Sequence, residues 1–234
     1  MGATTCVARV RDSGLIAGGR IESHAMPYAA VIFDIGGVVV GSPLHAIADY
    51  ERAQGIDAGT INRIIVGAGA EGSWARLERG EITPEQFFPI FDAECATAGC
   101  NASGRVMMAA MADATVPRPA MIAAIDRIRE SGRKTAALTN NWKSGEPALE
   151  PLARHFDVIV ESAVEGMRKP DPRIYELACA RLGVGAENAV FLDDIGTNLK
   201  AARVLGMTTI KVVEPGEALA ELGAILELDL TTGP

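Results

Sequence analysis

The 234-residue chain has few of the residues that mark metal-finger, disulfide-rich or membrane proteins. Its four cysteines form no CxxC pair, and with only three histidines there is no zinc-like spacing. No apolar run approaches the roughly 18 residues that span a bilayer, so no membrane span is expected. These absences favour reduced thiols and a cytoplasmic protein.

Basic residues are also fewer than acidic residues. The 22 Lys and Arg residues against 30 Asp and Glu give a formal net charge of −8. Nucleic-acid binding depends on basic patches, so no nucleic-acid partner is expected. Apolar residues at 48% and charged residues at 22% are ordinary for a soluble globular protein. The length suits one domain, or a core domain with an inserted module, and leaves the oligomeric state open.

Residues 1–26 differ in composition from the rest and are rich in Gly, Ala, Ser and Thr. Asp12 and Glu22 count against a transit peptide. Cys6 stands where a myristoylation signal requires Ser or Thr. The simplest interpretation is a flexible extension, or extraneous sequence ahead of Met26, and it is left out of the fold prediction.

Short apolar runs alternate with helical patterns over most of the remaining chain. This alternation predicts an α/β fold with a parallel sheet covered by helices on both faces. The expected strands are 29–33, 134–138, 156–160, 189–192 and 208–213, and the expected helices between them are 119–130, 171–182 and 197–205.

One long stretch after the first strand has only helical patterns, at 44–54, 60–66, 83–98 and 103–112. No strand signal interrupts it, so it predicts a helical module inserted into the sheet domain. The expected division is a core made of 27–43 and 118–234, with the inserted module at 44–117.

Polar side chains follow three of the expected strands. Asp34, Thr139 and Asp193 each stand at a strand's carboxyl end, where parallel sheets bind ligands. A carboxylate at Asp34 can attack phosphorus, although an Asp that caps a loop is equally compatible with this position taken alone. The hydroxyl of Thr139 and the backbone N–H groups near it can hold phosphate oxygens, or form an ordinary turn.

Two adjacent carboxylates, Asp193 and Asp194, repel each other unless a cation lies near them. Mg²⁺ fits, because it binds one or two carboxylates together with water and substrate phosphate. The alternative for Asp194 is capping of the helix at 197. Lys169, held between prolines, can offset the charge of a phosphoryl group, whereas most single lysines are simply solvated.

In combination, these residues resemble the motifs of the haloacid dehalogenase superfamily. The stretches that carry the resemblance are 31–38, 138–142, 169–175 and 190–200. Within the superfamily, the chain is most similar to the phosphatase-like N-terminal domains of soluble epoxide hydrolase and acyl-CoA dehydrogenase family members. The similarity covers about residues 29–213.

The resemblance implies a Mg²⁺-dependent phosphatase that forms an aspartyl-phosphate on a small organic phosphate monoester. It assigns roles position by position. Asp34 is the nucleophile and a metal ligand, Thr139 binds phosphate, and Lys169 steadies the phosphoryl charge. The remaining implied roles are metal binding by the Gly36 carbonyl, Asp193 and Asp194, lining of the site by Asn140, and support of the metal loop by Asn198.

The helical module is implied to be the superfamily's C1-type cap, which closes over the site and excludes water. Trp74 and Arg76 are cap residues expected to face the substrate. The alternatives are packing inside the cap for Trp74 and a solvated position for Arg76.

The sequence departs from the family pattern at Gly36, where superfamily phosphatases usually carry a second Asp as general acid and base. Such assistance is typically worth about 10²–10⁴-fold in rate. Water, a good leaving group, or a cap residue such as Glu71 or Glu78 could replace it.

Three functions are therefore weighed. A phosphatase is the leading hypothesis. A non-enzymatic protein that binds a phosphorylated ligand or a protein partner is the alternative that Gly36 suggests. A 2-haloacid dehalogenase ranks last, because that branch needs no Mg²⁺ and usually lacks the paired acidic ligands found here at Asp193 and Asp194.

Overall fold

A five-stranded parallel sheet forms the centre of the computed structural model, which describes residues 28–143 and 149–231. The predicted extension at 1–26 lies outside the described residues. The strands are β1 (Ala30–Phe33), β2 (Lys134–Thr139), β3 (Val158–Glu161), β4 (Ala189–Asp193) and β5 (Thr208–Lys211), in the spatial order β3-β2-β1-β4-β5. All four strand pairs are parallel, so the predicted α/β class is confirmed.

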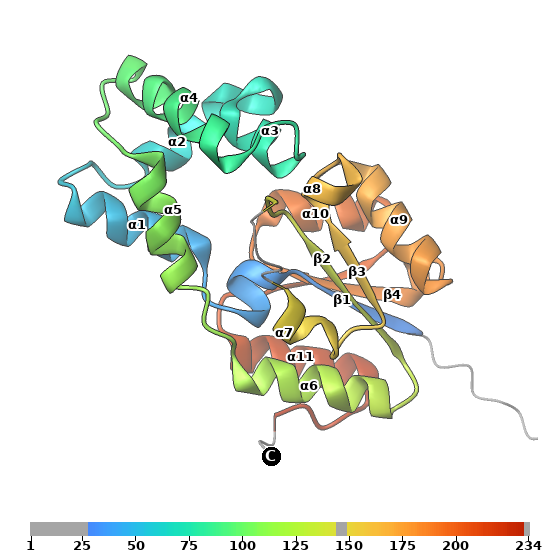
Figure 1. Ribbon diagram of the computed structural model, residues 1–234. Helices are drawn as coiled ribbons and strands as arrows, with labels where there is room; N and C mark the ends of the chain where they lie inside the picture. Colours follow the sequence, from blue (N-terminus) through green and yellow to red (C-terminus); the bar gives the residue numbers. More distant parts are fainter. Residues whose placement is uncertain (1–27, 144–148, 232–234) are drawn as a thin grey trace, which may run out of the picture.

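Helices cover both faces of the sheet (Figure 1). Helices α6 (Pro119–Glu130) and α11 (Pro215–Leu226) pack on the face to which Val31 and Phe33 point. Helices α9 (Pro172–Leu182) and α10 (Gly196–Val204) pack on the opposite face, against Ala30 and Ile32. Because successive strand residues point to opposite faces, a strand buried on both sides is apolar throughout, as β1 is.

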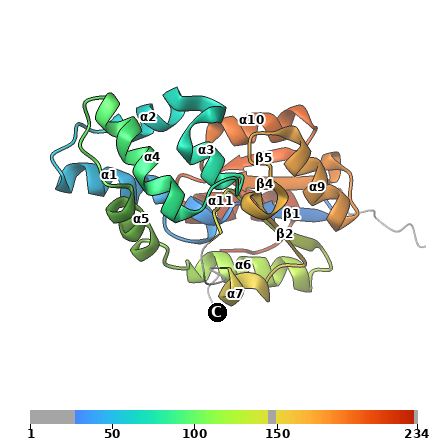
Figure 2. The ribbon, with the colours of Figure 1, turned by 45° about the horizontal axis from the view of Figure 1, so that its top comes forward.

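The chain between β1 and α6 forms a separate group of helices beside the carboxyl ends of the strands (Figures 1 and 2). These are α1 (Pro43–Ala53), α2 (Thr60–Ala68), the short turn η2 (Gly69–Glu71), α3 (Ser73–Glu78), α4 (Pro84–Thr97) and α5 (Gly104–Asp113). This helical module has its own apolar core, in which Phe87 and Phe91 stack at 5.0 Å between ring centroids.

The two linkers that join the helical module to the sheet domain run side by side. The Gly41 N–H donates to the Val116 carbonyl at 3.0 Å, and the Arg118 N–H donates to the Val39 carbonyl at 2.9 Å. Between them, Val40 and Pro117 form an antiparallel bridge. The module therefore enters and leaves the sheet domain at one narrow connection.

Short elements complete the chain: the π-type turn η1 (Ile35–Val39), α7 (Glu150–Ala153), α8 (Ser162–Glu165) and η3 (Ala186–Asn188). Within the described ranges, no helix combines the length and apolar character that crossing a membrane requires.

Candidate active site

The site begins at the end of β1, where Asp34 is 7% exposed. Its backbone N–H donates to the Leu192 carbonyl of β4 at 2.9 Å, which continues the sheet ladder by one residue. Its Oδ1 accepts the Ile35 N–H at 2.7 Å as the chain enters η1. The side chain is thus fixed at the strand end that the sequence predicted, as both the cap of the turn and a buried carboxylate.

Lys169 joins the ends of β1 and β4 from the segment before α9. Its Nζ lies 2.8 Å from Asp34 Oδ1 and 2.7 Å from Asp193 Oδ2, and the residue is 1% exposed. Burial alone would lower the pKa of Lys169, but the two carboxylates outweigh burial and the pKa is raised. The lysine therefore stays charged in the interior.

Three carboxylates meet at this edge of the sheet. Asp34, Asp193 and Asp194 each place an oxygen within 4.8 Å of the others. Burial raises the pKa of Asp34, and the charges of Asp193 and Asp194 raise it further. Burial and the charge of Asp193 likewise raise the pKa of Asp194. One lysine cannot neutralise three carboxylates, so the oxygen-only donor set fits a hard divalent cation such as Mg²⁺.

Asp193 is held by groups on both of its oxygens. Oδ1 accepts the Ile195 N–H at 2.7 Å, and Asn198 Nδ2 lies 3.2 Å from Oδ1 and 3.1 Å from Oδ2. The Tyr175 hydroxyl in turn donates to the Asn198 carbonyl at 3.0 Å. Asn198 thus holds the Asp193 carboxylate, and its support of a metal-binding loop stays a prediction. Helix α10 begins after Ile195 without a side-chain cap, so the alternative of Asp194 as its cap is wrong.

Thr139 and Asn140 lie at the end of β2, next to Asp34. Thr139 is 5% exposed and its hydroxyl lies 3.5 Å from the Asn140 carbonyl. The Asn140 amide pairs with the backbone of Lys169: Oδ1 accepts its N–H at 2.8 Å, and Nδ2 donates to its carbonyl at 3.0 Å. Asn140 therefore positions Lys169, and its contact with substrate stays a prediction.

Trp74 and Arg76, the predicted substrate contacts of the helical module, occupy different environments. Trp74 is 8% exposed, packs edge-on to Phe87, and donates from Nε1 to Glu78 Oε1 at 3.0 Å. The Arg76 side chain is 38% exposed, with Nε 3.8 Å from Glu81 Oε2. These positions match the packing and solvated alternatives, and a substrate role for either residue stays a prediction.

Two glycines shape the turn that follows Asp34. A Cβ on Gly36 would meet the Pro43 ring at 2.9 Å, because α1 begins directly beside it. Gly37 has φ +77°, and a Cβ there would lie 2.1 Å from Asp194 Oδ2. Gly37 thus makes room for Asp194 in the acidic cluster formed by Asp34, Asp193 and Asp194, whereas Gly36 packs beside Pro43.

Some contacts at the site join residues far apart in the chain, so no local sequence pattern predicts them. Arg118 Nη1 donates to the carbonyls of Gly37 at 2.7 Å and Val38 at 3.1 Å. The Ser42 hydroxyl donates to Asp194 Oδ2 at 3.4 Å. Arg168 places Nε 2.7 Å from Glu78 Oε2 of the helical module. The Arg-Lys-Pro run around Lys169 gave no indication of this last partner.

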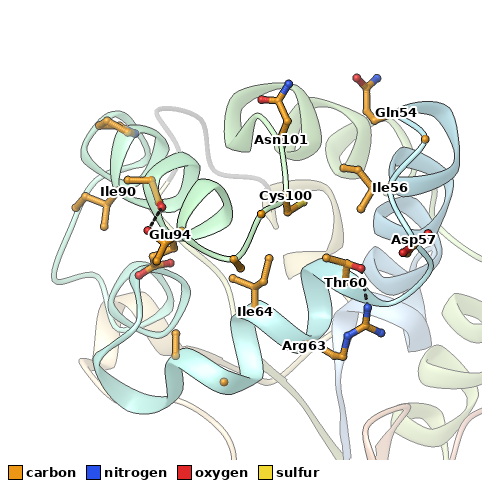
Figure 3. Close-up of a pocket in the computed structure, with 18 residues that line it drawn as sticks. Gln54, Ile56, Asp57, Thr60, Arg63, Ile64, Ile90, Glu94, Cys100 and Asn101 are labelled. Carbon is orange, nitrogen blue, oxygen red and sulfur yellow. Dashed lines mark hydrogen bonds between the residues drawn. The ribbon is translucent and has the colours of Figure 1, made fainter.

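A large groove lies elsewhere, within the helical module between α2 and α4 (Figure 3). Its volume is about 1370 Å³, and side chains such as Ile64, Ile90 and Cys100 line it. The hydrogen bond from Arg63 to the Thr60 hydroxyl, 2.6 Å long, lies on its wall (Figure 3). None of the predicted site residues lines this groove, so it is separate from the acidic cluster.

A sequence profile of the haloacid dehalogenase-like hydrolase family matches residues 28–206, which include the acidic cluster and Lys169. The chain belongs to this family of hydrolases. The relatives agree with the predicted resemblance. Acyl-CoA dehydrogenase family member 10 of Mus musculus is 42% identical over 91% of this chain. Bifunctional epoxide hydrolase 2 of Sus scrofa is 33% identical over 89% of it.

The chain spans 20% of the length of the first relative and 40% of the second. It matches 95% of the sesquiterpene phosphatase astK of Aspergillus oryzae, at 26% identity over 83% of this chain. Among solved structures, a family enzyme of Bacteroides thetaiotaomicron in complex with magnesium and inorganic phosphate superposes with a TM-score of 0.58. That match has 20% identity and covers 83% of this chain and 98% of the other, and it supports the fold.

Proposed function

We propose that this hydrolase is a Mg²⁺-dependent phosphatase that acts on a small organic phosphate monoester through an aspartyl-phosphate at Asp34. The observation that carries the proposal is the convergence of Asp34, Asp193 and Asp194 on one point beside the buried Lys169. A phosphatase named among the relatives, astK, adds support.

The three carboxylates and the Gly36 carbonyl would hold Mg²⁺. When bound, the ion would shield the negative phosphate from the negative nucleophile and stabilise charge in the transition state. The donor set supports this choice, because carboxylate and carbonyl oxygens suit Mg²⁺ and nitrogen or sulfur donors do not.

The residues of the chain then divide the chemistry. A carboxylate oxygen of Asp34 forms a bond to phosphorus as the bond from phosphorus to the ester oxygen breaks. The departing alkoxide takes a proton and leaves as the alcohol. Thr139 and the Lys169 ammonium offset charge on the phosphoryl oxygens. Water then attacks phosphorus, loses a proton, and releases phosphate with Asp34 restored.

The helical module is proposed to act as a cap that excludes bulk water from the site and leaves room for the attacking water molecule. Its position beside the carboxyl ends of the strands supports the proposal (Figure 1). Trp74 lies in the apolar core of the module, and Arg76 is the cation of the module from which a contact to phosphate is expected.

Phosphate release from para-nitrophenyl phosphate and a panel of phosphate esters tests the proposal. Release that needs Mg²⁺ and stops with EDTA is the expected result. Para-nitrophenolate is a good leaving group and needs no acid, so it should react even though Gly36 has no side chain to donate a proton. If protein that binds Mg²⁺ releases no phosphate from any ester of the panel, the phosphatase proposal is wrong and a phosphate-ligand-binding protein is favoured.

The dehalogenase alternative makes the opposite prediction. Carbon attack by Asp34 needs no metal, so halide would be released from 2-haloacids in the presence of EDTA. The adjacent carboxylates of the buried Asp193 and the partly buried Asp194 disfavour this function, because a metal-free site gains nothing from two neighbouring carboxylates shielded from water.

A further inference from the structure

The carboxylate of Glu78, a residue of the helical module, contacts the sheet domain. Glu78 ends α3 and is 7% exposed. Its Oε1 accepts the Trp74 indole N–H at 3.0 Å, a contact inside the module. Its Oε2 faces the sheet domain, 2.7 Å from Arg168 Nε and 3.5 Å from Asn140 Nδ2. The carboxylate therefore divides its two oxygens between the two halves of the molecule.

Both partners of Glu78 Oε2 control the lysine of the site. Asn140 binds the N–H and the carbonyl of Lys169 with its side-chain amide. Arg168 is the residue before Lys169 in the chain. The lysine itself bridges Asp34 and Asp193 at 2.8 and 2.7 Å. A displacement of Glu78 would therefore also displace the Lys169 ammonium group that contacts Asp34.

Two further contacts show the module docked at this place. Trp74 of the module meets Trp142 of the sheet domain edge-on, with ring centroids 6.1 Å apart. Gly80, two residues after Glu78, approaches so closely that a Cβ would lie 2.3 Å from the Ala163 carbonyl. The Glu78 ion pair thus lies in a tight, largely buried contact, where losing one partner costs more than at the surface.

We propose that Glu78 is a positioning residue that couples closure of the helical module to the placement of Lys169 beside Asp34. The inference rests on the proposed phosphatase function and adds a residue to it. Closure brings Glu78 onto Arg168 and Asn140, and these two fix the lysine backbone. Lys169 is then correctly placed beside Asp34 only when the module covers the site.

The chain carries its own reporter for closure, because its two tryptophans, Trp74 and Trp142, lie on opposite sides of this contact. Acrylamide quenching of tryptophan emission, measured on the full chain without substrate, is the first readout. Glu78→Gln keeps an acceptor for Trp74 and removes the charge that Arg168 faces. Arg168→Gln removes the same ion pair from the other side without touching the module.

Both variants are expected to raise quenching relative to wild type, whereas Glu85→Gln, an exposed glutamate of the same module, leaves it unchanged. In turnover, each of the two should lower kcat by about 10²-fold through misplacement of Lys169. KM should change little, and the double variant should be no worse than either single one.

Unchanged quenching in both Glu78→Gln and Arg168→Gln would overturn the coupling. A double variant whose fold-loss in kcat equals the product of the two single losses would also overturn it, because that is the result expected of independent effects. The fluorescence arm does not require activity, so a protein without phosphatase turnover still reports whether Glu78 holds the module. Failure of the proposed function is therefore distinguishable from failure of this inference. If Glu78→Gln does not fold, Arg168→Gln, whose side chain is 29% exposed, carries the same test.

Discussion

At the residue scale, Lys169 links the carboxylates of Asp34 and Asp193, and the side-chain amide of Asn140 holds the backbone of this lysine. Asp34, Asp193 and Lys169 could be chosen from sequence because each follows or precedes a recognisable strand or helix. The second task of Asn140, as a clamp on Lys169, could not, because a bond across 29 residues leaves no local pattern. The burial of Glu78 is equally invisible in the Glu-Arg-Gly-Glu run that contains it.

A substitution at Gly37 tests how closely the turn after Asp34 fits the acidic cluster. Gly37→Ala should weaken Mg²⁺ binding by at least about 10-fold, because its Cβ would displace Asp194 and because φ is positive. Titration calorimetry with Mg²⁺ measures the change. Gly196→Ala is the matched control, since a Cβ there meets nothing within 4 Å. Equal affinities for the two variants would contradict this explanation of Gly37.

Substitutions at Gly36 and Pro43 test whether packing prevents an Asp, the usual acid–base residue, at position 36. Gly36→Asp alone should cost about 1–3 kcal/mol of unfolding free energy, because its Cβ overlaps the Pro43 ring. In a Pro43→Ala background the same change should cost clearly less. Denaturant titration of the four proteins gives this coupling. Additive costs would show that Pro43 is not the obstacle.

At the scale of elements, the helices and strands followed from local patterns wherever these were strong. Helix α4 begins at Pro84 with a complete capping box between Thr83 and Gln86, and the sequence displayed it. Helices α3, α7, α8 and α11 were not predicted. The first three have only 6, 4 and 4 residues and owe their form to tertiary contacts. Strand β3 begins two residues later than predicted, because Asp157 uses its side chain to bind β2.

Asp157 provides the pH test at this scale. Burial opposes ionisation, yet hydrogen bonds from the Thr135 N–H at 2.8 Å and from Arg129 leave its pKa below the ordinary value. A carboxyl whose folded pKa is lowered stabilises the fold above its unfolded pKa of about 3.9, and this stabilisation is lost as pH falls through the folded pKa.

Asp157→Asn should therefore lower Tm at pH 7, and its deficit relative to wild type should shrink below about pH 4. Thermal unfolding from pH 7 to pH 3 measures the difference. A Tm deficit that stays constant with pH would mean that ionisation of Asp157 does not contribute to the stability of the fold.

At the scale of the whole molecule, the sequence predicted a sheet domain with an inserted helical module, and the sheet with its helices on both faces is as expected. The docking of the module was beyond sequence reasoning, because it depends on close approaches such as Gly80 to Ala163 rather than on periodic patterns. The paired linkers at Gly41 and Arg118 make one narrow connection between the module and the sheet domain.

The acidic cluster should make stability depend on metal. Burial and the neighbouring carboxylates raise the pKa values of Asp34 and Asp194, so a bound cation is expected to stabilise their ionised forms and with them the fold. Mg²⁺ at about 100 times its Kd should add about 2.7 kcal/mol and raise Tm. Differential scanning fluorimetry with Mg²⁺ and with EDTA tests this, with Asp194→Asn expected to lose most of the shift. An equal shift in Asp194→Asn would place the ion elsewhere.

The most direct test of the central claim compares phosphate release by wild type and Asp34→Asn in saturating Mg²⁺. Asp171→Asn, a change of the same kind at the N-terminus of α9, serves as the control. Loss of at least about 10³-fold in kcat for Asp34→Asn, with Asp171→Asn near wild type, is the predicted result. Phosphate release that survives Asp34→Asn would contradict nucleophilic attack by Asp34.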